Sequence, residues 1–250
     1  MTVGYLMTWL MVFLRGVGIV LLLPQMAGHT APIIARLGLA MCIATILVGI
    51  LPPSAVPADY WQLIFSTAGE VALGLALGFV SQMTFAAVEF AGRIISSEIG
   101  LSAAPGFSPS DLASAPLSSF MTVFAIVLFF LFDGHLAVLS AFARSFVLAP
   151  PGHPFFNSGA SELVLGETSH VIELGLRISA PFVALNFLIN LSFAVLGRAV
   201  PRMNVFIMSA SIRALAGMAL LGGAGALIAR YLYIEFYQLP LRMLELLPAR

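Results

Sequence analysis

The chain has 250 residues, of which 60% are hydrophobic and 9% are charged, and its mean hydropathy is +1.05. A soluble domain carries roughly a quarter charged residues, so this composition excludes an ordinary soluble protein and is typical of a bilayer protein. Eleven basic residues balance eleven acidic ones, which argues against a nucleic-acid partner, and the single cysteine, Cys42, rules out a disulfide framework or a thiolate metal site.

Windows of high hydrophobicity predict about six long helices, so the expected fold class is an all-α, polytopic membrane protein whose helices pair as hairpins. In chain order, the predicted helices cover residues 5–23, 33–51, 61–90, 117–148, 171–196 and 205–233. We interpret residues 1–250 as a single membrane domain. Its parts are N-terminal helices in 1–150, a C-terminal helical hairpin at 171–233 and a short amphipathic tail at 234–250.

A polar stretch at about 92–116 separates the third and fourth predicted helices. It begins with the run "GRIISSEIGLSAAPGFSPSD", whose glycines, serines and prolines predict an irregular backbone. Arg93 and Glu98 near its start are expected to anchor this loop. On composition alone, the stretch is a connector between two helices.

Packing between helices is indicated by small and polar residues at four-residue spacing. In the third predicted helix, Gly74 and Gly78 form a GxxxG pair, which permits the close approach of another helix. Glu70 and Gln82 extend the same face, although a glycine-rich helix with Glu70 near its aqueous end is the alternative. On the last two helices, we expect the interface residues to be Asn186, Asn190, Ala214 and Gly222.

Three ionisable residues interrupt apolar runs. Arg15 at the centre of a span costs about 2.5–3.5 kcal/mol on insertion scales, so it should face protein or reach the membrane surface. Asp133 and His135 lie two residues apart on the predicted fourth helix and point in different directions, which disfavours a shared metal ion. We interpret them as structural contacts that stabilise assembly, with a proton-linked role as the alternative. Gly134 between them predicts a local kink or close packing.

Catalytic motifs are missing from the sequence. It contains no Walker loop, HExxH, CxxC or GxSxG motif, and its four histidines have no paired helical spacing. We therefore expect no enzyme activity, no cofactor and no bound metal. A stand-alone small-solute transporter is a second hypothesis, but the inverted repeats and broken helices typical of that class are not evident in the sequence.

Three segments together resemble the flagellar biosynthetic protein FliR family. The family's aGxxIxxqxGLsxAxxxdP-like pattern is similar to "EFAGRIISSEIGLSAAPGFSPSD", and its NGH-centred helix is similar to "FLFDGHLAVLSAF". Its last hairpin is similar to "ALNFLINLSFAVLGRAVPRMNVFIMSASIRALAGMAL". The resemblance covers nearly the whole chain, although Asp133 stands where the family more often has Asn, and Pro105 and Gly106 stand where bulkier residues are common.

The resemblance implies a subunit of a hetero-oligomeric, helical type III export gate in the bacterial cytoplasmic (inner) membrane, at the flagellar basal body. The implied partners are FliP and FliQ-type gate subunits, FlhB and FlhA-type export components, unfolded flagellar export substrates and membrane lipid. Injectisome homologues (SctT-like) share the architecture, so a virulence secretion system stays open as an alternative. With its Gly and Pro content, the polar stretch is then expected to contain a gate loop made of Gly100, Leu101, Ser102, Ala103, Ala104, Pro105, Gly106, Phe107, Ser108 and Pro109.

Overall fold

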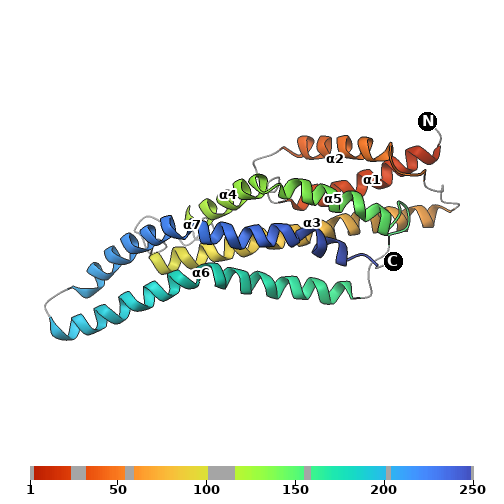
Figure 1. Cartoon of the computed structure of the whole chain (residues 1–250). Coiled ribbons are helices and arrows are strands. Elements are labelled where there is room, and N and C mark those ends of the chain that lie inside the picture. The colour runs from red at the N-terminus through yellow and green to blue at the C-terminus, as the bar shows by residue number, and fades with distance from the viewer. Residues whose placement is uncertain are drawn as a thin grey trace. The chain divides into compact units, whose positions relative to one another are not determined.

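The structure is a computed structural model of the chain, and it describes residues 3–23, 32–53, 59–100, 116–154, 159–200 and 204–248. Within these residues every regular element is a helix. Their order and bounds are α1 (Val3–Leu22), α2 (Ile33–Val48), α3 (Tyr60–Ile99), α4 (Pro116–Leu131), α5 (Gly134–Leu148), α6 (Ala160–Ala199) and α7 (Val205–Glu245) (Figure 1).

Four of the described helices are long and apolar enough to cross a membrane, namely α1, α3, α6 and α7. The interrupted pair of α4 and α5 passes the same test when it is taken as one span, which gives up to five candidates. With its composition, this architecture makes the chain an all-α, polytopic membrane protein. The predicted fold class is confirmed.

The third helix is longer than predicted, because α3 continues to Ile99 through residues that we expected to be loop from residue 92 onward. Arg93 pairs with Glu89 one turn earlier, at 2.6 Å between Nη2 and Oε1. Ser97 Oγ donates to the backbone carbonyl of Ile94 at 2.7 Å, so this hydroxyl is satisfied inside the helix. The expected loop start was wrong because these polar side chains bond locally and do not interrupt the helix.

The predicted fourth helix is in fact two helices, separated at Phe132 and Asp133. Asp133 has a left-handed backbone with φ of 56°, and its carbonyl accepts hydrogen bonds from the N–H groups of Leu136 and Ala137 at 3.0 and 3.1 Å. A left-handed residue cannot continue a right-handed helix, so α4 ends and α5 begins here. The break occurs where the sequence predicted a kink, with Asp133 as the left-handed residue.

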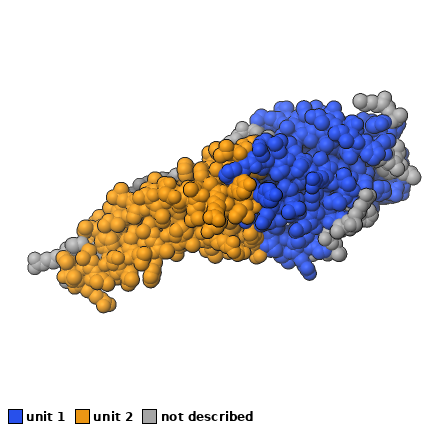
Figure 2. Space-filling view, viewed as in Figure 1, with its two compact units in different colours: residues 1–84, 132–168, 235–250 blue, residues 85–131, 169–234 orange. Residues whose placement is uncertain are grey.

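The chain forms two compact units, which are coloured separately in Figure 2. Unit 1 comprises residues 1–84, 132–168 and 235–250, and unit 2 comprises residues 85–131 and 169–234. The long helices α3, α6 and α7 each contribute to both units. Each unit has its own core.

In unit 1, α1 and α5 lie alongside the first part of α3, and α2 packs against α1 (Figure 1). α2 contributes two buried residues, Ala40 and Ala44, while most of its remaining surface is exposed. Leu247, two residues after the end of α7, packs with Leu73 and Ala149, and Leu244 in the last turn of α7 packs against this cluster. Fully or almost fully buried apolar residues of this core are Met11, Val12, Leu73, Leu77, Ala149, Met243 and Leu247.

In unit 2, the second part of α3 packs against α4, α6 and α7 at three glycines. A Cβ at Gly92 would lie 2.7 Å from the Cα of Ser118 on α4, and a Cβ at Gly175 of α6 would lie 3.1 Å from the carbonyl oxygen of Ala87. Gly217 of α7 is similarly close to Ile99. Buried apolar residues of this core include Ile95, Met121, Phe129, Ile178, Phe182 and Leu232.

Candidate functional site

Arg15 of α1 forms a fully buried polar cluster in unit 1. Its side chain is fully buried, and each of its three nitrogens has an acceptor. Nε donates to Glu70 Oε2 at 2.6 Å, Nη1 to Ser145 Oγ at 3.0 Å and Nη2 to the carbonyl oxygen of Ala149 at 3.0 Å. The Phe146 ring centroid lies 4.1 Å from the guanidinium carbon, which adds a cation–π contact. Arg15 therefore faces protein.

Glu70 of α3 completes this cluster. Its second carboxylate oxygen accepts the backbone N–H of Gly152 at 2.9 Å, in the turn that follows α5. A Cβ at Gly74 would overlap the carbonyl of Arg15, and a Cβ at Gly78 would lie 3.0 Å from the carbonyl oxygen of Ile19. The two glycines thus let α1 and α3 approach closely enough for the ion pair to form.

The ion pair ties together three helices and one turn, and its chemistry is structural. Both side chains are 0% exposed, so no substrate or solvent reaches them. All five of their polar atoms have partners. Gln82, which lies further along the same predicted face of α3, is half-buried.

Asp133 and His135 stand at the start of α5. Asp133 is exposed and caps the helix with its backbone carbonyl, while its side chain makes no capping hydrogen bond. His135 is half-buried. Among the residues that the structure describes, no group of three or more His, Cys, Asp or Glu side chains has the arrangement of a metal site.

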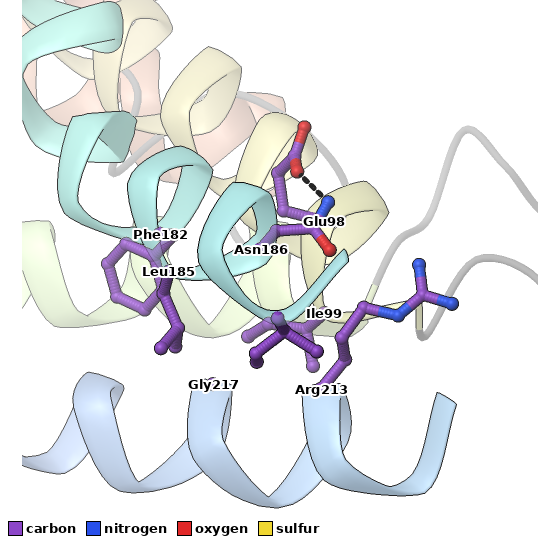
Figure 3. Close-up of a pocket in the computed structure, with 8 residues that line it drawn as sticks. Glu98, Ile99, Phe182, Leu185, Asn186, Arg213 and Gly217 are labelled. Atoms are coloured by element: carbon purple, nitrogen blue, oxygen red, sulfur yellow. Dashed lines mark hydrogen bonds between the residues drawn. The ribbon is translucent and has the colours of Figure 1, made fainter. Parts of the chain in front are cut away.

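A second polar cluster lies in unit 2, at the C-terminal end of α3 (Figure 3). Glu98 accepts a hydrogen bond from Asn186 Nδ2 of α6, and Asn190 Nδ2 donates to Asn186 Oδ1 at 3.2 Å. Arg213 rises from α7 beside Ile99 and lines the same pocket. We call Glu98, Asn186, Asn190 and Arg213 the α3-end cluster.

The pocket of the α3-end cluster is narrow, with a cavity volume of about 10 Å³. Apolar side chains close it, because Ile99 of α3 presses against Gly217 of α7 so tightly that a Cβ at this glycine would overlap Ile99. The remaining lining comes from α6, through Phe182, Leu185 and Ile189. The cluster is therefore a contact among three helices with room for about one water molecule.

Gly100 directly follows α3; it has φ of 84° and donates its N–H to the carbonyl of Ser97 at 3.1 Å. This left-handed glycine is a common helix terminator. Of the predicted gate loop, only Gly100 is described, and it lies immediately after the α3-end cluster. The other predicted gate residues, Leu101 to Pro109, lie outside the described residues.

The remaining predicted interface residues lie on α7. Ala214 is half-buried, and Gly222 is exposed with no atom within 4 Å of a Cβ placed on it. Gly222 lines an open apolar groove of about 340 Å³ between α4 and α7, together with Phe120, Met121, Phe124, Met218, Leu221, Gly225 and Ile228. The sequence patterns did not single out Arg213. An isolated arginine inside an apolar window was the signal that would have identified it.

Comparison with known proteins places these features in a family context. The sequence model described as "Bacterial export proteins, family 1" matches residues 6–239. Flagellar biosynthetic protein FliR of Escherichia coli (strain K12) is 29% identical over 250 residues, covering 97% of this chain and 96% of that protein. FliR of Pectobacterium carotovorum subsp. carotovorum is 31% identical, covering 82% and 80%. Yop proteins translocation protein T of Yersinia pestis is 29% identical over 62% of this chain and 60% of that protein.

Proposed function

This chain belongs to the bacterial export proteins, family 1, and from that premise we propose that it is a subunit of the flagellar type III protein export apparatus. In this role it helps to form the gated, protein-conducting core that passes unfolded flagellar proteins across the cytoplasmic membrane. FliP and FliQ-type subunits are its direct neighbours, and FlhB and FlhA-type components are further partners.

The observation that carries the proposal is the large apolar surface of α6 and α7 that the chain itself leaves uncovered. Of an apolar window in each helix, 22% is buried in α6 and 17% in α7, against 44% in α1. Lipid would cover an entirely apolar surface equally well, so exposure alone does not distinguish a subunit from a monomer. The polar residues on these helices provide that distinction.

Several polar groups lie exposed on α6 and α7. Glu173 and Arg177 form an ion pair on α6 with side chains 55% and 60% exposed. Asn190 and Arg230 are also exposed. Charged and amide groups are unfavourable against hydrocarbon and normally face protein or a water-filled cavity. We infer that neighbouring subunits cover these surfaces.

Purification in mild detergent tests the subunit assignment. We expect tagged chain to retain small membrane proteins of the export apparatus in fixed stoichiometry. A matched sample from cells that lack FliP and FliQ-type genes should yield the chain without them. Recovery of the chain alone, or as a homo-oligomer, from cells that contain all components would contradict the proposal and favour a stand-alone transporter.

We also propose that Gly100 to Pro109 contribute the closure of the channel. The support is the Gly and Pro content of this segment and its start at Gly100, the residue that terminates α3. Deletion of Ala103–Gly106 should raise ion leakage through assembled complexes. Unchanged leakage together with normal export would remove the gating role while leaving the subunit assignment intact.

A virulence injectisome is the second candidate system, and the match to Yop proteins translocation protein T favours keeping it. Complementation separates the two systems. Restored motility in a strain that lacks FliR, without restored effector secretion in a strain that lacks the injectisome homologue, is the expected result. The reverse outcome would assign the chain to a virulence system.

A further inference from the structure

Glu98 occupies an electrostatically unfavourable position in the last turn of α3. The C-terminal end of a helix carries partial negative charge from its free carbonyl groups, which repels a carboxylate. No basic residue is present in the last turn of α3. Within the described residues, a hydrogen-bond donor to the Glu98 carboxylate lies on another helix, at Asn186 of α6.

Two donor side chains stand at the pocket, on two different helices. Asn186 of α6 donates to Glu98 and is itself held by Asn190, as described above. Arg213 of α7 lines the pocket with Glu98. The Arg213 hydrogen bonds found in the described structure go back to its own helix, from Nε to the Ser209 carbonyl and from Nη2 to Ser209 Oγ, both at 3.3 Å.

A hydrogen bond between the Glu98 carboxylate and the Arg213 guanidinium would be stronger than the bonds that these two side chains make in the described structure. A hydrogen bond between a guanidinium and a carboxylate is roughly twice as strong as one between neutral groups, and the 3.3 Å bonds of Arg213 are longer than typical hydrogen bonds. Glu98 and Arg213 have long, unbranched side chains that line one small pocket. Both side chains have several rotatable bonds, so their charged ends can move within this pocket.

We propose that Glu98 is a positioning residue that holds the C-terminal end of α3 through two interchangeable partners, Asn186 on α6 and Arg213 on α7. The described structure shows the state with Asn186. Either partner alone holds the helix end, so the attachment passes from α6 to α7 without being released. The inference rests on the proposed function only for its purpose, which is to fix the point where the proposed gate loop begins.

The test measures the accessibility of a thiol next to Glu98. Ile99 is 3% exposed, so Ile99→Cys in a Cys42→Ser background should react slowly with a maleimide while the end of α3 is held. Labelling is measured in membranes from cells that contain the complete export apparatus, normalised to the amount of chain. The variants Asn186→Leu and Arg213→Gln are compared with their double variant and with Glu98→Ala.

Interchangeable partners predict a non-additive pattern of labelling rates. Each single variant should change the rate by less than about threefold, because the other partner takes over. The double variant and Glu98→Ala should each raise it by about tenfold or more, as expected for the loss of a hydrogen bond to a charged group. Arg93→Gln, at an exposed arginine of α3 that pairs with Glu89, is the matched control and should have no effect.

A second experiment tests the same inference without the double variant Asn186→Leu/Arg213→Gln. Glu98→Gln keeps an acceptor for both partners but removes the charge, which weakens the bond to the Arg213 guanidinium more than the bond to the Asn186 amide. In the Glu98→Gln background, Asn186→Leu should therefore raise the labelling rate strongly. Two results would overturn the inference. One is a double variant whose effect on the labelling rate equals the product of the effects of the two single variants. The other is no increase in the labelling rate with Glu98→Ala.

Export is measured in the same cells and separates this inference from the proposed function. If the labelling pattern is as predicted but deletion of the chain leaves export unimpaired, the attachment of α3 is supported and the export role is contradicted. If the two single variants act independently on the labelling rate and deletion of the chain abolishes export, the inference is overturned and the export role stands.

Discussion

Removing one member of the Arg15–Glu70 ion pair is expected to destabilise unit 1 strongly. Both side chains are 0% exposed, and Nε lies 2.6 Å from Oε2. Glu70→Leu leaves a buried guanidinium with Ser145 Oγ and the Ala149 carbonyl as its hydrogen-bond acceptors. We expect the free energy of unfolding to fall by about 3–5 kcal/mol, because a buried charge has lost its counter-ion. Arg15→Met leaves the carboxylate with the N–H of Gly152 and should be similarly destabilising.

The double variant Arg15→Met/Glu70→Leu distinguishes two contributions to the free energy of unfolding. One is the net stabilisation by the ion pair, and the other is the penalty of leaving one charge buried without its partner. Because the double variant removes both charges and keeps side chains of related size, it should be less destabilising than either single variant. Reversible unfolding of the purified chain by SDS in mild detergent, followed by circular dichroism, measures each free energy. Arg93→Met is the control, since Arg93 and Glu89 are 54% and 46% exposed, and its effect should stay below about 1 kcal/mol.

Two results would refute this reasoning about the buried pair. One is a pair of single variants, Glu70→Leu and Arg15→Met, that each unfold within about 1 kcal/mol of the unsubstituted chain, like an exposed pair. The other is a double variant whose destabilisation equals the sum of the two single variants. That sum would show that the two side chains act independently.

Three further predictions use the same unfolding assay. Gly74→Ala places a Cβ against the Arg15 carbonyl and should lower the free energy of unfolding by about 1–3 kcal/mol; an unchanged value would show that the helices can separate freely. The Cβ of Gly222→Ala meets no atom within 4 Å, so this variant should raise the free energy of unfolding by about 0.5–1 kcal/mol through helix propensity. The same variant should reduce the co-purification of partner subunits. Undiminished recovery of these subunits would argue against an interface at the groove. Asp133→Val should lower the free energy of unfolding by about 1–2 kcal/mol because of the positive φ, whereas Asp133→Asn should keep stability and assembly; an intact Asp133→Asn complex without export would indicate a proton-linked role.

Hydrophobic content was sufficient to predict the fold class and most helices, because each long apolar window must be helical in a membrane. Helix ends were harder to predict. The run that contains Arg93 and Ser97 has the composition of a loop, yet its polar side chains bond within α3. The break at Asp133 was placed closely by the neighbouring glycine, but nothing in hydropathy shows that an aspartate takes the left-handed conformation.

The buried ion pair could be predicted only in part. The sequence indicated that Arg15 must face protein, and that Glu70 shares a face with Gly74 and Gly78. Nothing in the sequence pattern joined Arg15 to Glu70, which lies 55 residues further along the chain. The pairing depends on how closely α1 and α3 approach, and that distance is set by tertiary packing.

Arg213 shows why the second cluster was harder still to predict. Hydropathy treats an arginine in an apolar window as an isolated cost and gives no information about its neighbours. Glu98, the acidic residue that lines the same pocket, stood in a segment that composition assigned to a loop. Once α3 extends to Ile99, the carboxylate and the guanidinium line one pocket.

The contrast between Arg15 and the exposed charges of α6 separates intrachain from intersubunit packing. Arg15 is fully paired inside unit 1, so its insertion cost is met within the chain. Glu173 and Arg177 satisfy each other but remain more than half exposed on a helix whose apolar window is mostly uncovered. A pair of this kind is favourable against protein or water and unfavourable against hydrocarbon. Its position on α6 therefore marks the face where we expect another subunit, whereas the charge of Arg15 on α1 is paired within this chain.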